Sequence, residues 1–176
     1  LTQCEEMEAA RRGHALYYLA LVEQAAHAWE GPQHGLWLGR LERDHNNLQA
    51  AMQWSLEQEK NGYGLETAFR FGAALRSFWQ VRGYFREGRA FLERVLAHSE
   101  GSLSSWRAKA LNDAVLLAVS QGDHAWGEAL CQQNLVYCRE LGDNSAVART
   151  LYLLGWLTLY KGNLATAHTR LSESLA

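Results

Sequence analysis

Three basic residues recur at nearly equal intervals along the chain and could together recognise a carboxylate-bearing ligand. They are Arg70, Lys109 and Arg149, which are 39 and 40 residues apart. Guanidinium and ammonium groups pair with carboxylates through charge-assisted hydrogen bonds. Charged residues also make up roughly 25–35% of ordinary protein surfaces. Three solvated surface charges are therefore the alternative interpretation, and the sequence leaves both open.

The sequence contains none of the common catalytic or metal-binding patterns. It has no Gly-Lys-Ser/Thr, which excludes a phosphate-binding P-loop. It also has no His-Glu-x-x-His, Cys-x-x-Cys or Gly-x-Ser-x-Gly. Gly62-Tyr63-Gly64 lacks the third glycine of a dinucleotide fingerprint, because Thr67 stands in its place. We therefore expect a protein that is not an enzyme and that uses no metal ion or cofactor.

The seven histidines are dispersed rather than clustered. His45 lies among apolar residues at helical spacing, so we expect a half-buried, hydrogen-bonded ring. His14 lies close to Tyr17 and Tyr18 on one predicted helix. This group is expected either to pack against a neighbouring helix or to border a small-molecule pocket.

The cysteines and the charge indicate where such a protein works. Three cysteines without a close pair, Cys4, Cys131 and Cys138, are typical of reduced thiols in a cytoplasmic protein. Cys131 and Cys138 are seven residues apart, so we expect both on one helix face, buried as small apolar side chains. The most apolar stretch, 151–160, is too short to cross a bilayer. The net charge of −2, with both signs interspersed, argues against direct nucleic-acid binding.

The elements that must position these side chains are helices. The chain has one proline and fifteen glycines, so few positions force a break and the glycines supply most of the turns. Between the glycines, apolar residues recur at i, i+3, i+4 and i+7, which is the helix period. We predict an all-α fold of about eight helices. Their ranges are 4–29, 34–59, 65–81, 85–98, 104–120, 124–140, 145–160 and 164–176.

From Gly62 onward, a turn glycine falls about every twenty residues, which predicts helix pairs of about forty residues. Aligning the copies on Gly83, Gly122 and Gly162 places a small residue in each second helix, where it would let the two helices approach closely. These small residues are Gly88, Gly127 and Ala167. We predict an N-terminal helical pair in 1–62 and three pairs in 63–176, at about 65–101, 104–142 and 145–176. We also expect the chain to be a fragment of a longer protein.

Stacked helix pairs form a solenoid whose first helices line a groove, so the same alignment predicts the side chains that face it. The predicted groove consists of Arg70, Ser77, Gln80, Lys109, Asn112, Leu116, Arg149, Tyr152 and Trp156. Seven tryptophans are more than an average chain of this length contains. Their rings are expected either to fill gaps between repeats or to anchor a partner.

The repeat resembles a tetratricopeptide repeat, most clearly in its last copy. There the signature positions are occupied by Leu151, Leu154, Gly155, Gly162, Ala167 and Leu171. The copies are longer than the usual length of about 34 residues, as in the sensor regions of bacterial transcription regulators of the maltose-activator type. Segments 37–54 and 78–93 are similar to segments of LuxR-like and AfsR-like signal-transducing NTPases. In those proteins the first segment follows the nucleotide-binding and winged-helix domains and opens the repeat array.

This resemblance implies a right-handed, TPR-like α-solenoid that acts as the sensor module of a cytoplasmic regulator. It implies that a peptide, a protein or a small inducer binds in the groove. Binding would regulate NTPase and DNA-binding domains of the same chain that lie outside these residues. The alternative is a structural scaffold or self-association module that senses no ligand, with the last helix pair as the surface for a homo-oligomer. Neither hypothesis involves a membrane or direct contact of these residues with nucleic acid.

Overall fold

The computed structural model describes residues 3–58, 63–100 and 104–175, and almost all of them are helical. The described residues contain no strand, so the predicted all-α fold is confirmed. The helices are α1 (Gln3–His27), α2 (His34–Arg43), α3 (His45–Glu57), α4 (Tyr63–Arg82), α5 (Phe85–His98), α6 (Ser105–Ser120), α7 (His124–Leu141), α8 (Asn144–Tyr160) and α9 (Leu164–Glu173). None of them, within the described ranges, is long and apolar enough to cross a membrane.

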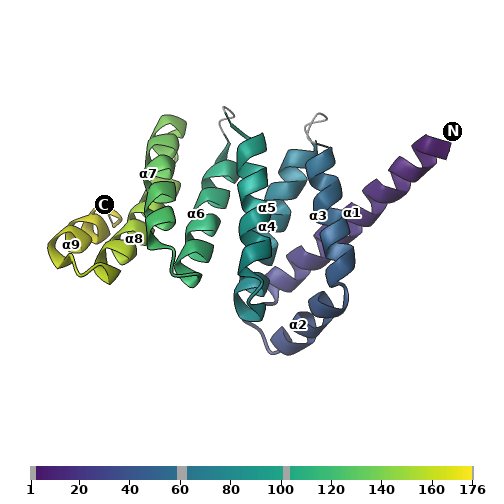
Figure 1. The fold of residues 1–176 in the computed structure, drawn as a ribbon, viewed down its shortest axis with the longest axis horizontal. Helices are drawn as coiled ribbons and strands as arrows, with labels where there is room; N and C mark the ends of the chain where they lie inside the picture. Colours follow the sequence, from purple (N-terminus) through teal and green to yellow (C-terminus); the bar gives the residue numbers. More distant parts are fainter. Residues whose placement is uncertain (1–2, 59–62, 101–103, 176) are drawn as a thin grey trace. The chain divides into compact units, whose positions relative to one another are not determined.

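One predicted helix, 34–59, is in fact two, because α2 and α3 meet at Asp44. This residue has φ −91° and ψ 9°, between the helical and extended regions. Its N–H still donates to the carbonyl of Arg40, and its own carbonyl accepts from the N–H of Leu48. The chain therefore bends while these backbone hydrogen bonds are kept, and α2 turns away from α3 (Figure 1). No glycine or proline marks the bend in the sequence.

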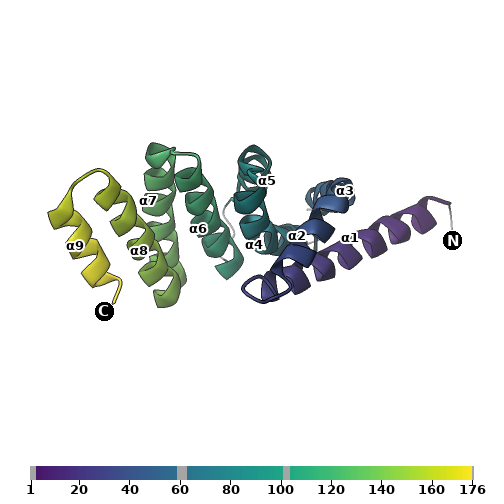
Figure 2. The same ribbon diagram turned by 90° about the horizontal axis from the view of Figure 1, so that it is seen from below.

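The helices form two compact units, Leu1–Tyr84 (unit 1) and Phe85–Ala176 (unit 2). In unit 1, α1 packs against α2, α3 and α4, and α3 also contacts α2 and α4. In unit 2 each helix from α5 to α9 contacts the next one, and α6 also contacts α8 (Figure 2). This serial stacking is α-solenoid-like. The three predicted repeats, the boundary at 62/63 and the right-handed superhelix stay predictions.

Three turns of unit 2 use the same two-residue sequence, a glycine followed by Asp or Asn. They are Gly122-Asp123, Gly142-Asp143 and Gly162-Asn163. At Gly142, for example, φ is 72°, in the left-handed region that favours glycine. The Asp143 carboxylate then accepts a hydrogen bond from the N–H of Ala146 and caps α8. Asp123 and Asn163 cap α7 and α9 in the same way.

A buried polar cluster joins α6, α7 and α8. The side-chain amide of Asn134 donates to the carbonyl of Ala108 and to Oγ1 of Thr150, at 3.0 Å each. The Thr150 hydroxyl lies 3.0 Å from Oδ1 of Asn112 and 2.7 Å from the carbonyl of Ala146, and its single hydrogen can be donated to either acceptor. Buried polar groups are costly unless they are paired. A slide of any of these helices against the others would break these hydrogen bonds, so the cluster fixes their register.

The helices of the last pair approach each other closely at Gly155 of α8. A Cβ atom on Gly155 would lie 2.8 Å from Cγ and Cδ2 of Leu171 in α9. Gly127, one of the predicted sites of close approach, has more room, since a Cβ there would meet Leu157 Cδ1 at 3.4 Å. In the last pair the glycine that permits the close approach therefore belongs to the first helix.

These two glycines allow a matched test of the packing. Replacing a glycine inside a helix by alanine favours the helix by about 1 kcal/mol. Gly127→Ala should therefore raise the free energy of unfolding by up to about 1 kcal/mol. Gly155→Ala should lower it by about 1–2 kcal/mol, because overpacking against Leu171 outweighs the same gain. Urea denaturation followed by circular dichroism measures both changes.

The variant Leu171→Ala supplies the control. Once the leucine side chain is shortened, Gly155→Ala should no longer destabilise the protein. Equal effects of the two glycine substitutions, or an unchanged effect of Gly155→Ala in the Leu171→Ala background, would contradict this account of the packing.

Candidate functional site

The predicted groove residues are divided between the two units. Arg70, Ser77 and Gln80 lie on α4 of unit 1, Lys109, Asn112 and Leu116 on α6 of unit 2, and Arg149, Tyr152 and Trp156 on α8 of unit 2. Because α6 and α8 contact each other, the six residues on these two helices lie in the same part of unit 2. The three residues on α4 lie in unit 1.

The unit 1 residues of the predicted groove have partners inside that unit. Arg70 binds Glu23 with two hydrogen bonds, each 2.8 Å long, from Nε and Nη2 to the two carboxylate oxygens. These bonds raise the pKa of Arg70 above its ordinary value. Gln80 accepts a hydrogen bond of 2.7 Å from Arg76, and Ser77 is half-buried. A ligand would have to compete with Glu23 for the charge of Arg70.

Asn112 belongs to the core rather than to an exposed groove. Its side chain is 1% exposed and takes part in the buried cluster with Thr150 and Asn134. Leu116, one turn further along α6, is half-buried. The repeat alignment placed Asn112 on the groove because helical spacing does not reveal a hydrogen-bond partner 38 residues away.

An exposed row of aromatic side chains runs along α8, and we call Tyr152, Trp156 and Tyr160 the aromatic stripe. These side chains are 47%, 42% and 64% exposed. Neighbouring ring centroids are 6.2 Å and 6.4 Å apart, within the range of favourable aromatic pairs. His124 of α7 stacks on Tyr160 at 5.6 Å. Tyr160 was not among the predicted groove residues, although it lies four residues after Trp156. His124 was not among them either, because it comes from the preceding helix, α7.

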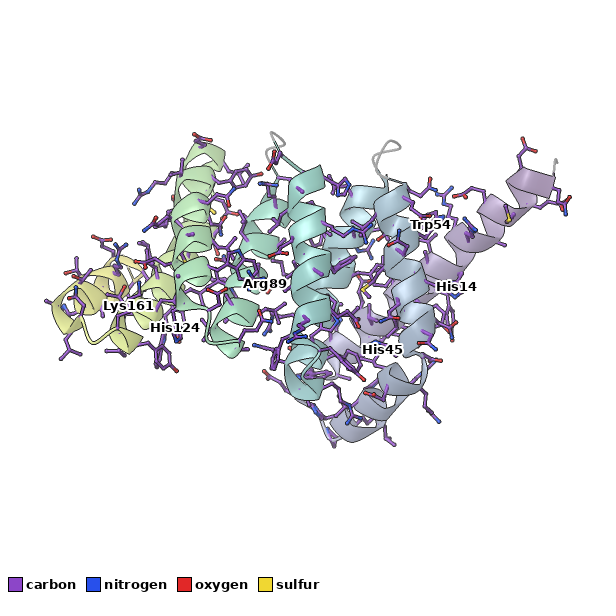
Figure 3. All side chains as sticks on the ribbon, viewed as in Figure 1. His14, His45, Trp54, Arg89, His124 and Lys161 are labelled. Atoms are coloured by element: carbon purple, nitrogen blue, oxygen red, sulfur yellow. The ribbon has the colours of Figure 1, made fainter. Side chains whose placement is uncertain are left out.

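The end of the stripe is bordered by charged residues. His124 and Lys161 lie near each other at this end of α7 and α8 (Figure 3). The Lys161 ammonium donates a hydrogen bond to the carboxylate of Glu128. Lys161 therefore has a partner, and its charge is not available to a ligand without competition.

Two basic groups of α6 and α8 remain without a carboxylate partner among the described residues. Lys109 is exposed, and its Nζ lies 5.8 Å from the centre of the Trp106 ring, a cation–π distance. Arg149 is exposed, and no described residue forms an ion pair with it. Arg149 directly precedes Thr150, and Lys109 lies one turn before Asn112. Thr150 and Asn112 lie 3.0 Å apart, so α6 and α8 adjoin within one turn of both basic residues.

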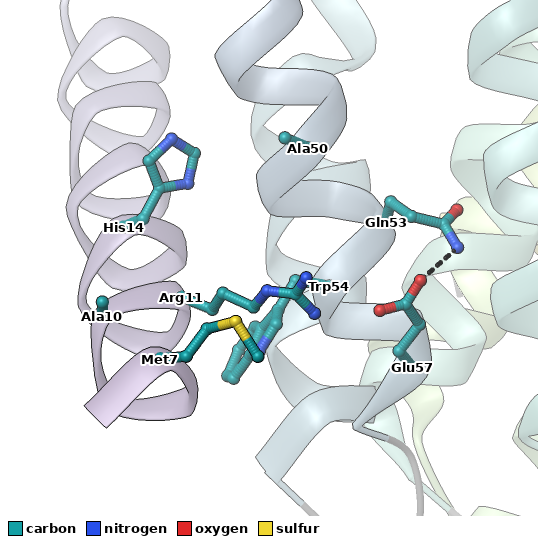
Figure 4. A pocket seen from close by; sticks show the side chains of 8 residues that line it. All are labelled: Met7, Ala10, Arg11, His14, Ala50, Gln53, Trp54 and Glu57. Carbon is teal, nitrogen blue, oxygen red and sulfur yellow. Dashed lines mark hydrogen bonds between the residues drawn. The ribbon is translucent and has the colours of Figure 1, made fainter. Parts of the chain in front are cut away.

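His14, Tyr17 and Tyr18 of α1 form the predicted cluster. His14 packs on Tyr18 with ring centroids 4.7 Å apart, and Tyr17 packs edge-on against Tyr18 at 5.1 Å. His14 also borders a pocket of about 520 Å³ between α1 and α3 of unit 1 (Figure 4). His45 is half-buried beside Tyr84, as predicted. The pocket itself could not be found from the sequence, since it depends on which faces of α1 and α3 meet.

The cysteines offer no reactive thiol in the part of unit 2 that is described. Cys131 and Cys138 are free and buried on α7, as predicted, whereas the side chain of Cys4 lies outside the described residues. Burial raises the pKa of Cys131 to about 12 and also raises that of Cys138. Among the described side chains no cluster of His, Cys, Asp or Glu could hold a metal ion.

Comparison with known proteins finds relatives that are named as transcriptional regulators. No protein-family model matches the chain. The chain is 29% identical over 171 residues to proteins of Mycobacterium bovis and Mycobacterium tuberculosis that carry the name "Putative HTH-type transcriptional regulator". The match covers 93% of this chain and 19% of each relative, so the chain spans about a fifth of their length. The chain is thus similar to these regulators over nearly its whole length.

The buried thiols lead to a test of their surroundings. At mildly alkaline pH, iodoacetamide should label Cys131 and Cys138 at least about tenfold more slowly in the folded protein than in concentrated urea, because only an accessible thiolate reacts. Mass spectrometry of tryptic peptides measures each rate. Above the ordinary thiol pKa the unfolded chain releases the Cys131 proton, whereas the folded chain keeps it. Stability should therefore fall between about pH 9 and 12.

The matched control for this pH dependence is Cys131→Ala, which should lose part of the alkaline decrease in stability. Rapid labelling of Cys131 in the folded protein would contradict the burial of its thiol.

Proposed function

We propose that this chain is a non-catalytic interaction and sensor module of a bacterial, cytoplasmic transcriptional regulator. It would control NTPase and DNA-binding domains that lie outside these residues, as in the LuxR-like and AfsR-like regulators that its sequence resembles. The similarity to regulators named as HTH-type supports the regulatory part. The observation that carries the interaction part is the aromatic stripe on α8, together with the basic groups of Arg149 on the same helix and of Lys109 on the adjoining α6.

The stripe has the properties of a protein-binding surface. Exposed Tyr and Trp side chains supply large contact areas and are enriched among the residues that dominate binding energy. Each ring of the stripe already packs against its neighbour. Less side-chain freedom is therefore lost when a partner binds than at isolated exposed rings.

The charges next to the stripe indicate the chemistry of the partner. Arg149 lies one turn before Tyr152 on α8, and Lys109 is exposed on the adjacent α6. Basic side chains without a carboxylate partner can accept one from a ligand without breaking an existing ion pair. We therefore propose that the surface formed by α6 and α8 of unit 2 binds a peptide segment with acidic residues at one end and apolar residues at the other.

The alternative function, a scaffold or self-association module, is favoured by a different observation. Leu164 and Leu175, in and after α9, are exposed apolar side chains at the C-terminal end of unit 2. Exposed apolar residues of this kind can mediate contacts between copies. Light scattering over a range of concentrations separates the two functions. Oligomers that Leu164→Ser or Trp156→Ala abolishes would support the scaffold, whereas a monomer at all concentrations would support the interaction module.

The proposed peptide chemistry can be tested by selecting binders from a random peptide library displayed on phage. Selected peptides should combine acidic and apolar residues. Trp156→Ser and Arg149→Gln should each lower the affinity for these peptides by about tenfold or more, as expected when an anchor or a charge-assisted hydrogen bond is lost. Isothermal titration calorimetry measures the affinities. In the full-length regulator, DNA binding with and without the peptide tests the regulatory part.

Matched controls lie on the exposed face of α7. Val136→Ser removes an exposed apolar side chain, and Arg139→Gln removes an exposed charge, both outside the predicted groove. Neither should change peptide affinity. Failure to select any peptide, or selected peptides that are insensitive to both groove substitutions, would rule out this function for the stripe.

A further inference from the structure

Unit 1 contains a pocket whose size suits a small molecule. Its volume of about 520 Å³ lies within the range of roughly 300–1,000 Å³ that is typical of small-molecule sites. The residues that line it come only from α1 and α3. They are Met7, Ala10, Arg11, His14, Ala50, Gln53, Trp54 and Glu57 (Figure 4). None of them belongs to the predicted groove or to the aromatic stripe.

The apolar part of the pocket has a defined shape. Ala10 of α1 and Ala50 of α3 have short side chains, which leave space where a larger residue would fill the gap between the helices. The Trp54 ring forms one wall, and its Nε1–H donates a hydrogen bond of 2.9 Å to Glu8 of α1. This bond links the two helices and fixes the orientation of the ring. Trp54 is 9% exposed, and the part of it that lines the pocket is an apolar surface that is in place before a ligand arrives.

The polar part of the pocket is dominated by the guanidinium group of Arg11. Figure 4 shows this group reaching from α1 into the space beside Trp54. No hydrogen bond or ion pair joins Arg11 to any described residue. Glu57, the carboxylate of the lining, instead accepts a hydrogen bond of 2.8 Å from Gln53 (Figure 4). Arg11 is therefore a cation that forms no ion pair with a described residue, in a pocket whose lining also contains the Glu57 carboxylate.

We propose that this pocket binds a small organic carboxylate with a flat or slender apolar body. The carboxylate accepts paired hydrogen bonds from the Arg11 guanidinium, whose planar geometry matches it. The body packs on the Trp54 ring and on the two alanines, where it displaces water from apolar surface. A ligand in this position touches both α1 and α3, so its binding stabilises unit 1. This site is separate from the proposed peptide groove and does not depend on it.

The indole N–H signal of Trp54 in a nitrogen–proton NMR correlation spectrum reports directly on this pocket. The probes are 3-phenylpropanoate, indole-3-propanoate and octanoate, and the variant Trp54→Phe assigns the signal. At least one probe should shift the signal in a saturable way. The uncharged 3-phenylpropanamide should bind about tenfold or more weakly than 3-phenylpropanoate, because it cannot form the charge-assisted bonds.

Two neighbouring arginines supply a matched pair of variants. Arg11→Gln should weaken probe binding by about tenfold. Arg12→Gln makes the same change one residue further along α1, outside the pocket lining, and should leave binding unchanged. Both side chains are exposed, so neither variant should unfold the protein. Ala50→Phe, which fills the pocket, should abolish binding while the helical circular dichroism spectrum is retained.

Three results would overturn the proposal. The first is the absence of a saturable shift with all three carboxylates. The second is equal binding of 3-phenylpropanoate and its amide. The third is equal sensitivity to the Arg11→Gln and Arg12→Gln substitutions. A peptide that still binds unit 2 in the Arg11→Gln variant would confirm that the two sites are independent.

Discussion

The hydrogen bonds of Asn134 determine how the helices of unit 2 stack and which of their faces remain exposed. Asn134 is fully buried and is satisfied only while Ala108 of α6 and Thr150 of α8 stay at their present level. A buried amide that loses its partners costs about 1–3 kcal/mol, so other registers are disfavoured. Thr150 is held inward by this bond. Because an α-helix turns by about 100° per residue, Tyr152 and Trp156 must then point away from the core. The polar cluster inside unit 2 therefore places the aromatic stripe on its surface.

The arginines of this protein have different roles because their neighbouring side chains differ. Arg70 is held by two hydrogen bonds to Glu23, and Arg89 binds both Glu93 and Asp123. These two arginines link helices within their own units. Arg11 and Arg149 have no such partner among the described residues. A ligand carboxylate gains most from a cation that it does not have to take from another carboxylate. The unpaired arginines are for this reason the better candidates for recognition.

Local sequence signals predicted the features that depend on near neighbours. The apolar period and the glycine spacing predicted the all-α fold, and the seven-residue spacing of Cys131 and Cys138 predicted that both are buried on one helix. Features that depend on distant partners were missed or misplaced. Asn112 was wrongly assigned to the groove. Its buried partner Thr150 lies 38 positions away in the sequence, so helical spacing did not reveal the contact. The bend at Asp44 was missed because no glycine or proline marks it in the sequence. The Arg11 pocket arises only where α1 meets α3, and no periodicity encodes that contact.

A ligand can regulate a larger protein only if it binds one of its conformations more tightly than another. The proposed carboxylate site meets this condition, because its walls come from two helices. Arg11 and Met7 belong to α1, whereas Ala50 and Trp54 belong to α3. A bound ligand favours every state in which these helices keep their present contact and disfavours any state in which α1 moves away. The proposed peptide surface of unit 2 is different, since the register of its helices is already held by Asn134. A peptide there adds contacts to a surface that is largely preformed. Sensing by a shift in structure is therefore better suited to unit 1, and recognition of a partner to unit 2.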